Sequence, residues 1–196
     1  MCVNFETSIT AFIIGTISGI LLYLQGVPEK KVIGLFIVFF SMVQLFEALI
    51  YKGYDTNGIL SKLLYLNLGF QGFFIFLLFW LYSFKNVMAY LVLTGIIALY
   101  FMVNVFYQPF NKAQLNTCLT WNFIREYYSE KLLQIMYALL FLYLFYKQTN
   151  KPIRNAGFVL LLTCIISVTF TLINLQNRPS IWCLTSALAG PLFLLI

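Results

Sequence analysis

The sequence predicts an all-α integral membrane protein, a polytopic bundle of about seven transmembrane helices. Of its 196 residues, 62% are hydrophobic and only 9% are charged, whereas a soluble domain has about 45–50% apolar and about 25% charged residues. The mean hydropathy is +0.90. Apolar stretches close to the roughly 20 residues that a spanning helix needs recur along the whole chain.

The predicted helices form one transmembrane domain that covers residues 1–196. They span residues 9–24, 32–51, 63–84, 87–107, 132–146, 156–175 and 181–196. Short connectors with Gly, Pro, Asn and Lys separate most of them, which favours antiparallel neighbours in one bundle. The longer connector, residues 108–131, contains aromatic and amphipathic stretches, and we expect it at the membrane interface.

Two of the predicted helices are less regular than the others. The segment 132–146 is short, although Glu130 and Lys131 can lengthen it by snorkelling. The segment 181–196 contains Gly190 followed by Pro191, which predicts a kink or an incomplete crossing. Six helices and a half-helix are therefore the main alternative to seven.

The charges predict how the chain is oriented. Its Lys and Arg residues give a net charge of +6 but are scattered among the connectors, which is typical of contacts with lipid and not with nucleic acid. Numbered in chain order, the odd connectors between predicted helices hold as many Lys and Arg residues as the even connectors, but at a higher density. Residues 1–8 carry none, and no signal-peptide cleavage site follows. We expect the N-terminus outside the cell or in a lumen and the C-terminus in the cytoplasm.

Glu47 is the one charged residue within a predicted span. Gln44 precedes it by one turn on the same helix face. An unpaired carboxylate in hydrocarbon is costly, so Glu47 needs a partner or a wet cavity, and such residues are functional candidates. Because the chain contains no His, any site must use carboxylates, thiols, hydroxyls and amides.

Other polar residues recur on single faces of predicted helices. They are the pairs Asn67 and Gln71 and Tyr100 and Asn104, and the stripe Thr163, Ser167, Thr171 and Asn174. Such amides most often join neighbouring helices, and such hydroxyls most often bond to their own backbone. The Gly15-x-x-x-Gly19 motif is typical of a close helix contact.

Alternating crossings bring several unusual residues to the side of the membrane where the chain begins. They are Cys2, Glu6, Ser8, Gln44, Glu47, Asn67, Cys118, Trp182 and Cys183. In an enzyme, Glu47 and Glu6 are the candidate acid–base groups, and Cys2 or Cys183 is the candidate nucleophile or metal ligand. The candidate ligand-binding residues are Gln44, Asn67, Gln71, Trp182 and Cys183.

Simpler roles for Cys2 stay open. A disulfide to Cys183 or Cys118 is one, if this face lies outside the cytoplasm. Acylation next to the membrane is another. The sequence does not identify a metal or a cofactor.

Three short stretches resemble a family of uncharacterised polytopic membrane proteins of bacteria and large DNA viruses. They are the Met-Cys start that leads to Glu6 and Ser8, the stretch from Gln44 through Glu47 to Tyr51, and Ser180-Ile181-Trp182-Cys183. The chain departs from the family at Val43, where a second Gln is common, and at Ala48, where Gly is common. The resemblance implies a site at these residues and no particular activity.

Three classes of function agree with these observations. The first is the binding or conversion of a small-molecule or lipid ligand at the thiol and carboxylate site. The second is a small-solute transporter or channel, although Gln44-x-x-Glu47 has no counterpart in the segment 156–175. The third is a structural or envelope membrane protein. The bilayer is the expected partner in each case, and a homo-oligomer stays open.

Overall fold

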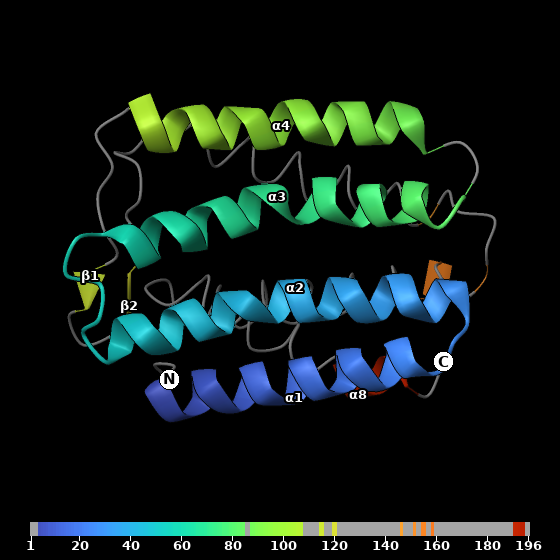
Figure 1. Ribbon diagram of the computed structural model, residues 1–196. Coiled ribbons are helices and arrows are strands. Elements are labelled where there is room, and N and C mark those ends of the chain that lie inside the picture. The colour runs from blue at the N-terminus through green and yellow to red at the C-terminus, as the bar shows by residue number, and fades with distance from the viewer. Residues whose placement is uncertain are drawn as a thin grey trace.

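The computed structural model describes residues 4–84, 87–107, 114–115, 119–120, 146, 151, 154–155, 158 and 190–194. Within this part of the chain, four long helices lie side by side in chain order (Figure 1). They are α1 (Phe5–Leu24), α2 (Pro28–Tyr51), α3 (Ile59–Leu81) and α4 (Met88–Tyr107). Each packs against the next in one antiparallel layer, and each is long and apolar enough to cross a membrane. The prediction of a multi-pass helical membrane protein is confirmed for these helices.

The first three helices begin one turn earlier than the sequence analysis predicted, because their first turns are polar. Asn4 caps α1 by accepting a hydrogen bond from the Thr7 amide at 2.8 Å. Pro28 occupies the start of α2, where its missing N–H costs nothing. Hydropathy detects only the part of a helix that lies in hydrocarbon, so it misses such turns. At its other end α3 stops at Leu81 and not at residue 84, and Ser83 has a positive φ of 62°.

The predicted helices 132–146 and 156–175 lie outside the described residues, apart from isolated positions. The seventh, 181–196, is described only at its end, where Gly190–Phe193 form a short helix, α8. The total of seven helices is therefore not tested by the described part. The connector 108–131 contains two short strands, β1 (Gln114–Leu115) and β2 (Leu119–Thr120), paired antiparallel with Gln114 opposite Thr120. This pair is the one departure from an all-α fold among the described residues.

Helices α1 and α2 make the closest contact in the described layer. A Cβ atom added at Gly19 would lie 2.6 Å from the Gly34 carbonyl oxygen and 2.7 Å from Val38 Cγ2. The Thr16 and Ser41 hydroxyls share a hydrogen bond of 3.2 Å across the same interface. Small residues that let backbones approach are typical of membrane helix contacts. The predicted packing role of the glycine motif is confirmed at Gly19, and Gly15 is buried beside it.

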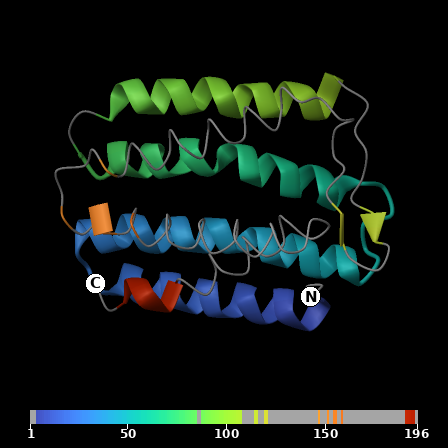
Figure 2. The same cartoon turned by 180° about the vertical axis from the view of Figure 1, so that it is seen from behind.

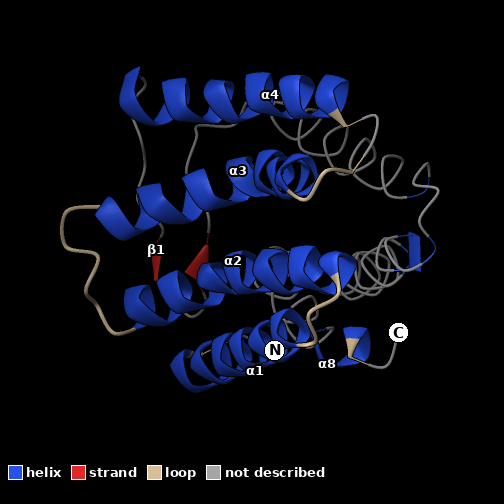
Figure 3. Ribbon diagram, turned by 45° about the vertical axis from the view of Figure 1, so that its right-hand side comes forward, coloured by secondary structure: helices blue, strands red, loops and turns tan. Residues whose placement is uncertain are grey.

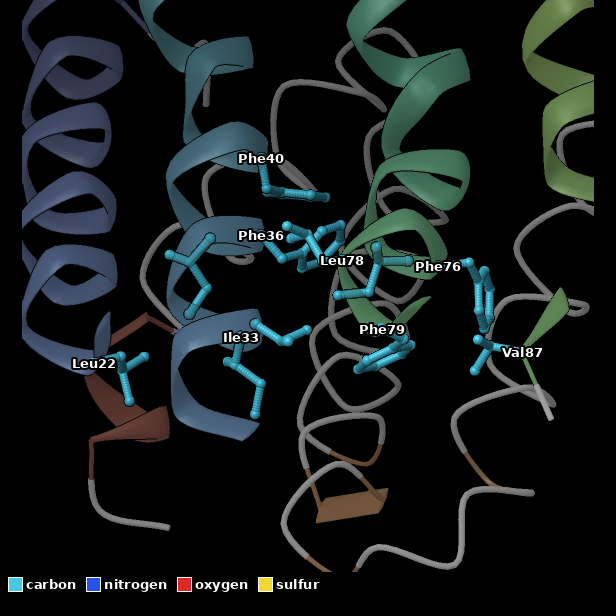
Figure 4. Packing of buried hydrophobic residues seen from close by; sticks show 11 residues of the cluster. Leu22, Ile33, Phe36, Phe40, Phe76, Leu78, Phe79 and Val87 are labelled. Carbon is cyan, nitrogen blue, oxygen red and sulfur yellow. The ribbon is translucent and has the colours of Figure 1, made fainter. Parts of the chain in front are cut away.

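Two apolar clusters hold α2, α3 and α4 together. The first includes Phe36 and Phe40, whose side chains extend from α2 toward α3, together with Phe79 of α3 (Figure 4). The second includes Val43 of α2 and Phe101 of α4, which packs directly on Gly69. Aromatic side chains thus fill the spaces that small residues leave, as shape complementarity in a membrane core requires.

The end of the layer opposite the N-terminus, called the far end below, holds basic and aromatic groups. Lys31 Nζ lies 5.7 Å from the centre of the Tyr23 ring, within range of a cation–π interaction. Tyr82 follows the last turn of α3, and burial, followed by its interaction with Tyr23, raises the pKa of its phenol. Such residues are typical of a membrane interface.

The short helix α8 lies beside the far half of α1 (Figure 2). A Cβ atom added at Gly190 would lie 3.1 Å from Ser18 Cβ and 3.5 Å from Ile37 Cγ2. Leu194 packs on the cluster that contains Leu22. The chain therefore runs along α1 toward the far end in its last described residues.

We expect the Gly19→Ala variant to lower the free energy of unfolding by about 1–3 kcal/mol, because the added methyl meets backbone atoms that cannot move aside. The matched control is Gly95→Ala in α4, where the new Cβ would lie 3.4 Å from the Phe73 ring. That variant should be neutral or slightly stabilising, since Ala favours helices more than Gly does. Unfolding in detergent micelles measures both values, and equal effects would contradict the close contact.

Candidate functional site

One end of the layer collects the start of α1, the end of α2, the start of α3 and the end of α4 (Figure 1). We call it the N-terminal end. The pair β1 and β2 lies at the same end, near the connection between α2 and α3 (Figure 3). Of the residues that the sequence analysis grouped together, Glu6, Ser8, Gln44 and Glu47 lie there.

Gln44 and Glu47 form a hydrogen-bonded pair within α2. The Gln44 amide nitrogen donates to Glu47 Oε2 at 2.9 Å, and both residues are 0% exposed. An amide donor partly compensates for the loss of water around a carboxylate. The sequence predicts that Glu47 needs a partner, and Gln44 supplies one.

The amide oxygen of Gln44 has no hydrogen-bond partner within the described part of the chain. Most buried polar atoms in proteins are paired, so an unpaired one needs an explanation. The pair therefore presents an acceptor that a donor from a ligand or water can use, next to a carboxylate.

Ser8 lies on the neighbouring helix at about the same level. The Thr16–Ser41 hydrogen bond and the position of Lys52 Nζ, 4.3 Å from the centre of the Phe5 ring, set the register of α1 against α2. This register places Ser8 beside the last two turns of α2. Ser8 is fully buried, and its hydroxyl has no partner among the described residues.

The depth of Glu47 follows from the same register. Lys52 comes five residues after Glu47, which corresponds to about 7.5 Å along a helix. Lys52 lies just beyond the end of α2, where a basic group marks the edge of the hydrocarbon. Glu47 is therefore buried between helices but lies within two turns of the aqueous phase.

Glu6 differs from Glu47 in its surroundings. It is exposed in the first turn of α1, where the helix dipole favours a negative charge. It precedes the buried Ser8 by two residues, so the two point to nearly opposite sides of the helix. The described structure does not bring the Glu6 side chain to the Gln44–Glu47 pair.

Asn67 and Gln71 of α3 lie nearer the middle of the layer. The Asn67 amide nitrogen donates to the Phe39 carbonyl oxygen at 3.2 Å, and Gln71 donates to Asn67 Oδ1 at 3.3 Å. Phe39 is eight residues before Glu47, about 12 Å along α2. These amides join α2 to α3, as polar residues between membrane helices usually do.

Asn104 of α4 is buried with its amide nitrogen unpartnered in the described part, while Tyr100 is exposed. The two residues lie four apart on α4, as the sequence predicts, but only Asn104 is buried. Asn104 therefore stays a further polar group without an assigned role.

Asp55 lies in the connector between α2 and α3. Its carboxylate accepts hydrogen bonds from the Leu60 amide at 2.8 Å and the Ser61 amide at 3.3 Å, and also from the Ser61 hydroxyl. It thus stabilises the exposed amides at the start of α3. The signal was present in the sequence, because Asp before an Asn-Gly turn and a helix is typical of such a cap.

The cysteines and Trp182 of the predicted site lie outside the described residues. The described part contains no group of three or more Cys, Asp or Glu side chains that could hold a metal ion. Glu47 and Gln44 together offer a carboxylate and an amide oxygen, which suit hydrogen-bond donors.

No family model, curated protein or solved structure matches this chain. The structure of the Gln44–Glu47 pair is therefore the basis for a functional proposal.

Proposed function

We propose that this integral membrane protein binds a small or lipidic ligand with hydrogen-bond donors at its N-terminal end, through Glu47 and Gln44. The observation that carries the proposal is the fully buried Gln44–Glu47 pair, in which the Gln44 amide oxygen lacks a partner in the described part of the chain. The resemblance to the uncharacterised membrane protein family belongs to this proposal, since Gln44-x-x-Glu47 is one of its motifs.

The depth of the pair favours a lipidic ligand with a polar head. A carboxylate about 7.5 Å below Lys52 lies where the head of such a molecule meets its hydrocarbon chain. A hydroxyl or amine on that head can donate to Glu47 and to Gln44, while its chain lies between apolar side chains. Cys2 and Cys183 stay candidate groups for conversion of the bound ligand.

The proposal includes seven crossings. Helix α4 ends at the N-terminal end, whereas the described residues between 146 and 158, drawn in orange, lie at the far end (Figures 1 and 2). One crossing by the predicted helix 132–146 would connect them. The last described residues also lie at the far end, and two crossings by the predicted helices 156–175 and 181–196 would return the chain there.

The proposal also includes an outward-facing N-terminal end. Lys30 and Lys31 lie at the far end in the first turn of α2, and the described residues between 146 and 158 add Lys151 and Arg154. The N-terminal end has Lys52 and Lys62 among its described residues. The positive-inside rule assigns the more basic side to the cytoplasm.

We expect a panel of monoacyl alcohols, monoacylglycerols and acyl amines to contain a compound that raises the unfolding temperature of the purified protein. Glu47→Gln should weaken the binding of that compound about thirtyfold, equivalent to the loss of about 2 kcal/mol for a hydrogen bond to a charged group. The variant keeps an acceptor for Gln44, so it should fold. Glu6→Gln is the matched control, a carboxylate at the same end, and should bind normally. Stabilisation that is the same in all three proteins would contradict the site.

Labelling of single cysteines tests the orientation. In a background in which all native cysteines are replaced, Tyr54→Cys lies in the exposed turn between α2 and α3, and Val27→Cys lies in the turn between α1 and α2. A membrane-impermeant maleimide added to intact cells should label Tyr54→Cys and leave Val27→Cys unlabelled until the membrane is opened. The reverse pattern would place the N-terminal end in the cytoplasm.

A further inference from the structure

Ser8 is a buried polar residue at the N-terminal end that the proposed site does not include. Its side chain is 0% exposed, and its hydroxyl has no hydrogen-bond partner in the described part of the chain. Helix α1 contains a second buried serine, Ser18, whose hydroxyl donates to the Ile14 carbonyl oxygen at 2.7 Å. A serine inside a helix most often bonds to its own backbone in this way. The Ser8 hydroxyl is therefore available for another partner.

Ser8 lies at the same level of the bundle as Glu47. A Cβ atom added at Gly190 would lie 3.1 Å from Ser18 Cβ and 3.5 Å from Ile37 Cγ2, so Ser18 of α1 and Ile37 of α2 are level with each other. Ser8 precedes Ser18 by ten residues, and Glu47 follows Ile37 by ten residues. Because α1 and α2 are antiparallel, both steps lead about 15 Å toward the N-terminal end.

Ser8 and Gln44 lie on the helix faces that meet α8 in the other half of the bundle. Gln44 follows Ile37 by seven residues, almost two full turns, so the two share one face of α2. Ser8 belongs to the same buried stripe of α1 as Ser18. Gln44 is about one turn deeper than Ser8, and its amide oxygen also lacks a partner in the described residues. Two unpaired polar atoms on adjacent helices thus differ by about one turn in depth.

We propose that Ser8 is a third binding residue of the site and makes it selective for a lipid with a vicinal diol in its head, such as a monoacylglycerol or the corresponding glyceryl ether. This role of Ser8 rests on the proposed function, whose class of ligand it narrows. The Ser8 hydroxyl both donates and accepts hydrogen bonds, whereas the Gln44 amide oxygen only accepts. A hydroxyl on the ligand suits both residues, because it too donates and accepts.

The polar groups of the site lie at two depths, and a vicinal diol has an oxygen for each. The middle hydroxyl of a glyceryl head is next to the chain and reaches Gln44, the deeper group. The terminal hydroxyl is nearer the aqueous phase and reaches Ser8 and Glu47. An alkyl amine or a simple alcohol has a single polar atom and leaves one depth without a partner. A buried polar group that stays unpaired costs free energy, so the site disfavours such ligands.

Binding of two matched ligands to the purified full-length protein tests this role. One is the glyceryl ether of oleyl alcohol, and the other is the same ether without its terminal hydroxyl. Their dissociation constants are measured by titration in detergent micelles for the unchanged protein, Ser8→Ala and Ser18→Ala. Ser18→Ala is the matched control, because Ser18 is a buried serine of the same helix whose hydroxyl already has a partner.

We expect the unchanged protein to prefer the diol and Ser8→Ala to reduce this preference about fivefold, which corresponds to the loss of a hydrogen bond of about 1 kcal/mol. Ser18→Ala should keep the full preference. Without ligand, Ser8→Ala should unfold at no lower a temperature than the unchanged protein, because it removes a buried hydroxyl that has no partner in the described part of the chain.

A preference for the diol that is the same in Ser8→Ala as in the unchanged protein overturns the role of Ser8, and so does an equal loss in Ser18→Ala. A lower unfolding temperature of ligand-free Ser8→Ala shows that the hydroxyl has a partner within the protein and also overturns it. These results leave the proposed function intact as long as Glu47→Gln weakens the binding of both ethers. If neither ether binds in a way that depends on Glu47, the proposed function fails, and the role of Ser8 fails with it.

Discussion

The hydrogen bond from the Gln44 amide to the Glu47 carboxylate is the interaction on which the account of this molecule depends. It lies on a helix that is otherwise apolar, in a layer whose outer faces are covered by Leu, Ile, Val and Phe side chains. Hydrocarbon offers no partner to a polar group, so each one must be paired within the protein or reach water. Glu47 meets this constraint through its neighbour and through its position near the end of α2.

The same constraint explains the other polar residues of the layer. Asn67 bonds to the backbone of α2, Thr16 bonds to Ser41, and Asp55 caps α3. Each of these groups connects two elements or completes one, and each already has a hydrogen-bond partner within the protein. The Gln44 oxygen and the Ser8 hydroxyl differ, because they are buried and lack partners in the described part. They lie at the same end of the bundle, which is why the site is proposed there and not at Asn67.

Much of the fold could be predicted from the sequence, because hydropathy reports directly on the length of chain in hydrocarbon. It located α1 to α4 but missed the first turns of α1, α2 and α3, which are held by Asn4, Pro28 and Asp55 through local hydrogen bonds and backbone geometry. Alternation of crossings predicted the end at which Glu47 lies. It could not predict that Asn67 would be engaged by Phe39, since the register of α3 against α2 depends on contacts such as the stacking of the Phe39 ring on the Phe74 ring, whose centres lie 4.3 Å apart. These contacts join residues that are distant in sequence.

The most direct measurement is a double-mutant cycle between Gln44 and Glu47, with Leu at each position and at both, in which the free energy of unfolding is measured in detergent micelles. A buried hydrogen bond predicts that Leu at one position costs more when the other position is native, with a coupling of about 1–2 kcal/mol. Replacement of both groups should then cost less than the two single changes added together. Strict additivity, to within about 0.3 kcal/mol, would contradict the bond and the site built on it.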